Sequence, residues 1–154
     1  MKNKRIFIFA VLIFFLIFGL SGQEASQGWQ AKTLWESIEK IQRVIVGDID
    51  PNHRGDEIIS VTQKGEVVYT LESPDGWVND ILWVDTASLT GAAIGELDTG
   101  HPGREVIVGG SRGDVELIQF DTKKHQTIFD QGGSLHGLSV GELNAAYPSQ
   151  EVVA

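Results

Sequence analysis

The sequence predicts an all-β fold made of repeated units of four antiparallel strands. The main observation is one segment that occurs three times, starting at Gly47, Gly95 and Gly141, so that successive copies lie 48 and 46 residues apart. Each copy carries a Glu ten positions after its Gly, and two β-branched residues, which favour strands, follow that Glu. A period in the forties with strand-like units is typical of repeat arrays and β-propellers.

Within one repeat, runs of β-branched and aromatic residues occur four at a time between turn residues. The runs of the first two copies are residues 43–46, 57–61, 66–71, 78–84, 92–94, 105–109, 115–120 and 126–129. No segment after Lys40 has a sustained helical period. Four strands in a repeat of this length predict one propeller blade. We therefore expect blades at 41–86 and 87–134 and the start of a further blade at 135–154.

The segment before the first blade, residues 29–36, is expected to form the outer strand of a blade that closes the ring. Thr33-Leu34-Trp35 hold the same repeat position as Ile81-Leu82-Trp83 and Thr127-Ile128-Phe129. The alternative is a short amphipathic helix over residues 31–41, because apolar residues recur there at helical spacing. The repeat register favours the strand.

The first 21 residues have the layout of a secretory signal peptide. A basic start is followed by an apolar run from Ile6 to Leu20, and Gly19 and Ser21 provide small residues before a cut after Ser21. The run is shorter than the roughly 20 residues of a spanning helix, although an uncleaved anchor is the alternative. There is no Cys and hence no disulfide or lipoprotein attachment site. We expect an exported protein, periplasmic or extracellular.

The chain is acidic, and its charge excludes two classes of partner. The formal net charge is −9, and removal of residues 1–21 takes away three basic residues and no acid, which gives −12. A surface of this sign repels phosphate backbones and anionic lipid headgroups. Neither nucleic-acid binding nor peripheral membrane binding is expected.

Residues 22–154 contain only two complete blades, whereas propeller rings usually take about four to eight. The unpaired edges of such a piece predict association or aggregation. We expect the chain to be the N-terminal part of a longer protein whose downstream sequence supplies the remaining blades. A natural short form that assembles from several chains is the alternative.

The first acidic loop resembles the FG-GAP/VCBS class of β-propeller repeats, which includes the integrin α head and many secreted bacterial proteins. The matched residues are Val46-Gly47-Asp48-Ile49-Asp50, Asn52 and Glu57-Ile58-Ile59, and the resemblance extends over residues 29–154. It implies a propeller and, in this loop, a Ca²⁺ site, because Ca²⁺ binds closely spaced carboxylate and carbonyl oxygens. The implied ligands are Asp48, Asp50, Asn52 and either Asp56 or Glu57.

Departures from the family pattern favour a second interpretation of these acids. The central Asp-Gly pair of the family loop is absent here, and Gly100 and Ala146 stand where the second and third copies need an oxygen. In that interpretation the acids form Asx-turns and accept backbone N–H groups, and the recurring Glu locks the turn. His53 and His101, inside the same loops, are expected to cover the neighbouring blade.

The sequence predicts a binding or scaffolding module with a protein or polysaccharide partner. Its loops and channel rim would make the contact, and His136, just before the third inner strand, is a candidate rim ligand. No motif pairs a nucleophile with a base. The alternative is the N-terminal part of a propeller-fold enzyme, such as a polysaccharide lyase or hydrolase, with its acid and base residues on other blades.

Overall fold

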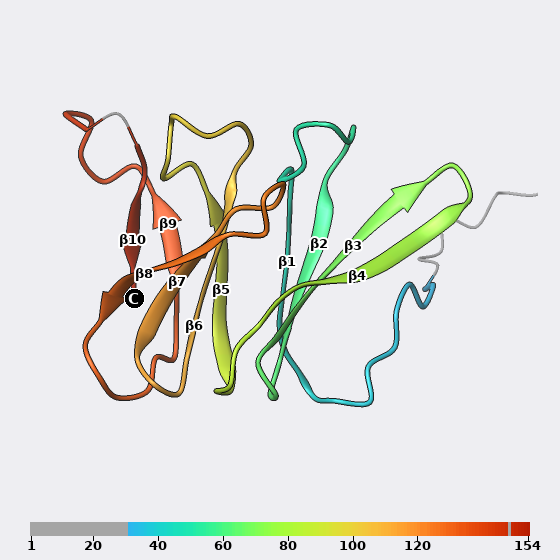
Figure 1. Ribbon diagram of the computed structural model, residues 1–154, viewed down its shortest axis with the longest axis horizontal. Helices are drawn as coiled ribbons and strands as arrows, with labels where there is room; N and C mark the ends of the chain where they lie inside the picture. The colour runs from blue at the N-terminus through green and yellow to red at the C-terminus, as the bar shows by residue number, and fades with distance from the viewer. Residues whose placement is uncertain (1–30, 148) are drawn as a thin grey trace, which may run out of the picture. The chain divides into compact units, whose positions relative to one another are not determined.

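The computed structural model describes residues 31–147 and 149–154, and every strand pair in them is antiparallel (Figure 1). The chain divides into residues 1–32 and 33–154, and the second unit holds all the strands described below. The described residues contain no helix, and so none that could cross a membrane. The predicted signal peptide at 1–21 lies outside them. The all-β prediction is confirmed.

Two four-stranded sheets follow one another along the chain, and a third sheet has two strands. The first sheet has the order β1 (Ile41–Gly47), β2 (Glu57–Thr62), β3 (Glu66–Ser73) and β4 (Gly76–Val84). The second has the order β5 (Leu89–Gly95), β6 (Glu105–Gly110), β7 (Asp114–Ile118) and β8 (His125–Asp130). In the third, β9 (Ser139–Gly141) pairs with β10 (Glu151–Val153). Each four-stranded sheet thus uses one predicted repeat.

The three copies share one strand register. The repeated glycine pairs with the repeated glutamate in each sheet, as Gly47 with Glu57, Gly95 with Glu105 and Gly141 with Glu151. The two larger sheets also place their bulges at matching positions, at 41/43 and 89/91 in the first strand and at 67/68 and 115/116 in the third. Equivalent sequence therefore produces equivalent hydrogen bonding along the chain.

The hydrophobic core lies between successive sheets. Its larger cluster joins Ile59, Val61 and Val67 of the first sheet to Val106 and Val108 of the second, and all five are fully buried. A smaller cluster of Ile107, Val115 and Leu135 packs against apolar residues around the third sheet. Strand β6 is buried along its whole length because apolar side chains cover both of its faces, while β8 is exposed throughout. The burial pattern thus distinguishes β6, inside the second sheet, from β8 at its edge.

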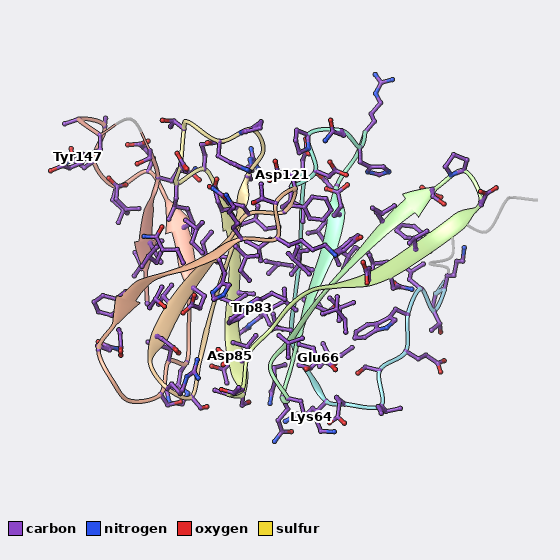
Figure 2. All side chains as sticks on the ribbon, viewed as in Figure 1. Lys64, Glu66, Trp83, Asp85, Asp121 and Tyr147 are labelled. Atoms are coloured by element: carbon purple, nitrogen blue, oxygen red, sulfur yellow. The ribbon has the colours of Figure 1, made fainter. Side chains whose placement is uncertain are left out.

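A clamp of polar residues joins the two larger sheets at the turn between β6 and β7. Arg112 contacts Asp85 and Asp114 at 2.8 and 2.7 Å, and its guanidinium also donates to the Thr86 hydroxyl. Asp85, after β4, is nearly buried, and Figure 2 shows it at the same edge as Lys64. The turn needs glycine, because Gly113 has φ +86° and a Cβ there would overlap a backbone carbonyl.

The strand expected at 29–36 is not formed in its described part. Residues 31–36 carry no strand or helix, so the helical alternative over 31–41 is wrong, and the first strand begins at Ile41. A strand forms by hydrogen bonding to a neighbouring strand, and none of the described strands pairs with this segment. Its role in closing a ring stays a prediction.

Candidate functional site

The three acidic loops lie at the same end of their sheets, along the upper edge in Figure 1. Each connects the first strand of a sheet to the second, between β1 and β2, β5 and β6, and β9 and β10. The repeat puts them there because each follows the glycine that ends an inner strand. This edge is the candidate functional site.

A buried glutamate locks the first two loops in the same way. Oε2 of Glu57 accepts hydrogen bonds from the backbone N–H groups of Ile49 and Asp50 at 3.0 and 3.2 Å. Oε2 of Glu105 likewise accepts from Leu97 and Asp98, at 2.8 and 3.3 Å. Both glutamates are fully buried. The recurring Glu is therefore a turn-locking acceptor, as the second interpretation predicts.

The third loop repeats this contact at a more exposed position. Oε2 of Glu151 accepts from the N–H of Leu143 at 2.8 Å. Glu151 itself is partly exposed, and Leu143 is 67% exposed. The same sequence signal thus gives the same contact with less burial around it.

The residue three positions after each repeated glycine forms an Asx-turn. The side chain of Asp50 accepts from Asn52 N–H at 2.9 Å, while its backbone carbonyl accepts from His53 N–H at 3.0 Å. Asp98 makes the same pair of contacts in the second loop and Asn144 in the third. Short polar side chains at these positions thus hold the turn locally, as their chemistry allows.

His53 adds a second lock to the first loop. Its Nδ1 lies 2.6 Å from Oε1 of Glu57, and its Nε2 lies 2.7 Å from the backbone carbonyl of Glu72. Both partners are acceptors, so both ring nitrogens donate, which is the hydrogen bonding of an imidazolium. The Glu72 carbonyl and then the Glu57 carboxylate raise the pKa of His53 above its usual 6.5. Both hydrogen bonds of the imidazole are to residues of its own sheet, and the expected contact with the neighbouring blade stays a prediction.

His101 takes a related but looser place in the second loop. Its Nε2 lies 2.7 Å from Oδ1 of Asp121, while its Nδ1 stays 3.7 Å from Oε1 of Glu105. Nδ1 of His101 and Oε1 of Glu105 are buried and have no hydrogen-bond partner among the described residues. In the third loop Tyr147 holds the corresponding position and is 62% exposed. Figure 2 shows Tyr147 at the outer end of that loop and Asp121 near the second.

The structure divides the predicted calcium ligands into two groups. Asp48, Asn52 and Asp56 are exposed on the loop. Glu57 uses both carboxylate oxygens, and Asp50 uses one, on hydrogen bonds within the loop. No group of three or more His, Cys, Asp or Glu side chains in the described residues is arranged to hold a metal ion. Calcium binding stays a prediction, and it would draw on the exposed group together with the second carboxylate oxygen of Asp50.

His136 lies away from the acidic loops. It is exposed in the connection between β8 and β9, at the opposite end of β9 from the third loop. There it lines an open depression of about 500 Å³ together with Leu135, Ser139 and Val153. The structure does not bring it together with the predicted calcium ligands, and its role as a rim ligand stays a prediction.

A scan of the chain against protein-family models gave no match, and a search of curated proteins gave none either. The features of the chain that bear on function are therefore its repeat, its locked loops and its inter-sheet packing.

Proposed function

We propose that this chain contributes blades to an exported β-propeller of the FG-GAP/VCBS type. Further repeats complete the ring, and the acidic loops bind a protein or polysaccharide partner. The observation that supports the proposal is the agreement among the three repeats. Strand register, Asx-turn and locking glutamate recur in every copy, although the loop sequences differ.

The locked loops favour binding over a purely structural role. Their backbones are held by glutamate carboxylates, buried in the first two loops and partly exposed in the third, so the side chains at the loop tips are presented in fixed positions. Binding residues are often carried in this way, on loops positioned by a rigid scaffold. Asp48, Asn52 and Tyr147 are exposed on these loops. Carboxylate, amide and phenol groups suit the hydroxyls of a polysaccharide or the polar surface of a protein.

A binding screen on the exported protein tests the proposal. Immobilised polysaccharides and extracellular proteins are presented to it. The ligand found is then titrated against the wild type and against a triple variant of Asp48→Ala, Asn52→Ala and Tyr147→Ala. The matched control replaces two exposed residues of the opposite edge, as Gln63→Ala with Ser111→Ala. We expect the loop variant to lose at least about tenfold in affinity, equivalent to about 1.4 kcal/mol, while the control binds normally.

Equal affinities of the loop variant and the control variant would show that the acidic loops are not part of the binding site. The same samples serve to test the enzyme alternative, because a lyase or hydrolase would release new chain ends from the bound polysaccharide. Turnover by the wild-type protein would replace the binding proposal with an enzymatic one.

Calcium is part of the proposal at the first loop only. Thermal unfolding with calcium is expected to have a higher midpoint than unfolding with chelator, with a gain of about 2.7 kcal/mol at a hundredfold excess over Kd. Asp50→Ala should abolish the gain, while Asn144→Ala in the third loop should preserve it. Equal midpoints for the wild type would show that hydrogen bonds alone hold the loop.

A further inference from the structure

The second loop contains two buried polar atoms that face each other without bonding. Nδ1 of His101 lies 3.7 Å from Oε1 of Glu105, and neither atom has a hydrogen-bond partner among the described residues. The side chain of Glu105 is fully buried, and that of His101 is 12% exposed. A buried polar atom without a partner is costly, because it has lost its hydrogen bonds to water and gained none. A change that joins these two atoms therefore stabilises both.

The proton on the other ring nitrogen of His101 explains why the two atoms stay apart. Nε2 lies 2.7 Å from Oδ1 of Asp121, and the oxygens of an ionised carboxylate only accept hydrogen bonds. A neutral imidazole has a single N–H, and this contact uses it at Nε2. Nδ1 is then an acceptor that faces a second acceptor, Oε1 of Glu105, and no hydrogen bond can form between them. The distances around His101 are thus those of the neutral ring.

The first loop contains the same pair of residues in the bonded state. His53 and Glu57 stand 48 residues before His101 and Glu105, at the same positions of the repeat. There Nδ1 lies 2.6 Å from Oε1 of the glutamate, and Nε2 lies 2.7 Å from a backbone carbonyl oxygen. Both ring nitrogens donate, as they do in an imidazolium. The repeat thus presents one closed and one open form of a single histidine–glutamate contact.

We propose that His101 and Glu105 form a pH-sensitive latch on the second loop. Protonation of Nδ1 turns it from an acceptor into a donor, and the imidazolium then bonds to Glu105 and Asp121 at once. The closed latch ties the loop to Glu105, the first residue of β6, and to the β7–β8 turn, which carries Asp121 (Figure 2). Histidine ordinarily changes its charge between about pH 5 and 8, so the latch closes in mildly acidic surroundings and opens in mildly alkaline ones.

Closure of the latch acts on the backbone of the loop through Glu105. Oε2 of this carboxylate already accepts from the N–H groups of Leu97 and Asp98. A bond from His101 to Oε1 holds the same carboxylate by its second oxygen, and a hydrogen bond to a charged partner is a strong one. The second loop, part of the candidate functional site, is therefore held more firmly in acid than in alkali. The latch belongs to the loop itself and does not depend on which partner the protein binds.

The charged groups nearest to the imidazole are carboxylates. Among the described residues, Glu105 and Asp121 are the acids within 4 Å of its nitrogens. The first loop packs against the second at Gly103, and the third does so where Gln150 accepts from the N–H of Glu96. The other charged side chains of these loops and of the turn after β7 are Glu96, Asp98 and Arg104, Asp48, Asp50, Arg54 and Asp56, Glu142, and Lys123 and Lys124. Of the three cations nearest in sequence, Lys123 is bound to Asp80 of β4, while Arg104 and Lys124 are exposed, so the two carboxylates in contact control the latch.

The test is NMR of the exported protein labelled with ¹⁵N, because the imidazole nitrogen signals show which ring nitrogen carries a proton. At about pH 8 we expect a bare Nδ1 on His101, and at about pH 5 the signal of the bare nitrogen should be lost. The N–H signals of Leu97 and Asp98 should shift over the same pH range, because their acceptor is the carboxylate of the latch. His101→Gln should abolish that shift. His136→Gln, at an exposed histidine outside the acidic loops, is the matched control and should preserve it.

Asp121→Ala tests the latch in the opposite direction. The Asp121 side chain is 32% exposed, so the variant should fold. Without this carboxylate the neutral ring can carry its one proton on Nδ1 and donate it to Glu105, so the latch should be closed even at about pH 8. A protonated Nδ1 in the wild type at that pH, a titration of His101 that leaves the Leu97 and Asp98 signals in place, or a bare Nδ1 in Asp121→Ala would each overturn the latch. None of these measurements involves a partner, so the latch and the proposed binding function fail separately.

Discussion

At the scale of single residues, the buried glutamates explain why the repeat keeps a Glu ten positions after its Gly. A carboxylate without partners is costly to bury, and these carboxylates are held by backbone N–H groups of the loop they close. Hydrogen bonds to a charged acceptor are stronger than those between neutral groups. In return, the loop N–H groups gain a buried acceptor. The buried carboxylate and the loop backbone therefore stabilise each other.

Glu105→Ala should destabilise the protein more than Glu151→Ala. Loss of Glu105 leaves the N–H groups of Leu97 and Asp98 without their acceptor, and we expect a loss of about 3 kcal/mol. Glu151 is partly exposed and accepts from one N–H group, so water can replace it, and the loss should be about 1 kcal/mol. Urea unfolding followed by tryptophan fluorescence measures both. Equal losses would show that the buried lock is not what stabilises the second loop.

His53 should make the first loop sensitive to pH. Its pKa is raised in the folded protein, so its contribution to stability is complete below the ordinary pKa of 6.5 and is lost as pH rises through the folded pKa. The difference in urea midpoint between the wild type and His53→Gln should therefore shrink from about pH 5 to about pH 9. His136→Gln, at an exposed histidine, is the control. A difference that grows with pH would contradict the imidazolium lock.

The sequence predicts part of this residue chemistry and misses part. The Asx-turns and the locking Glu follow from local spacing, since donor and acceptor lie within ten residues of each other. The place of His53 does not, because its Nε2 binds a carbonyl 19 residues away, on β3. The Arg112 clamp on Asp85 spans 27 residues and was also missed. Contacts that depend on where a neighbouring strand ends cannot be deduced from one loop.

At the scale of strands and sheets, the apolar runs predict the strands of both four-stranded sheets, because alternating burial and turn residues are local signals. Their ends are less well predicted. Strand β1 begins at Ile41 and not at Arg43, since pairing with β2 extends across a bulge. The segment at 29–36 shows the limit of repeat register, which assigns a position but does not supply a partner strand.

Gly95→Val should destabilise the protein far more than Gly141→Val, although both replace the same residue of the repeat. A Cβ at Gly95 overlaps Val140, whereas no described atom lies within 4 Å of one at Gly141. Overpacking of this kind costs about 3 kcal/mol, so the urea midpoint of Gly95→Val should fall clearly. Dilute samples keep association out of the measurement. Similar midpoints for the two variants would mean that the contact between the sheets rearranges to accommodate the added side chain at little cost in stability.

At the scale of the whole molecule, the repeat specifies how neighbouring sheets pack but not how many follow. The contact of Gly47 with Ile94 recurs between Gly95 and Val140, so each step along the chain is local. The closure of a ring depends on small rotations summed over all blades, and a repeat motif does not encode that sum. Blade number and partner therefore lie beyond what this sequence predicts, while sheet order and core position lie within it.

The two four-stranded sheets should unfold as one unit, because the larger core cluster draws its fully buried residues from both. Amide protons of β2, β3, β6 and β7 should then exchange with similar free energies, close to that of global unfolding. Strands β9 and β10 have three residues each and are partly exposed, so they should exchange faster. Hydrogen exchange followed by mass spectrometry measures both groups. Much faster exchange in one four-stranded sheet than in the other would mean that each sheet is stable by itself and that the shared core does not couple them.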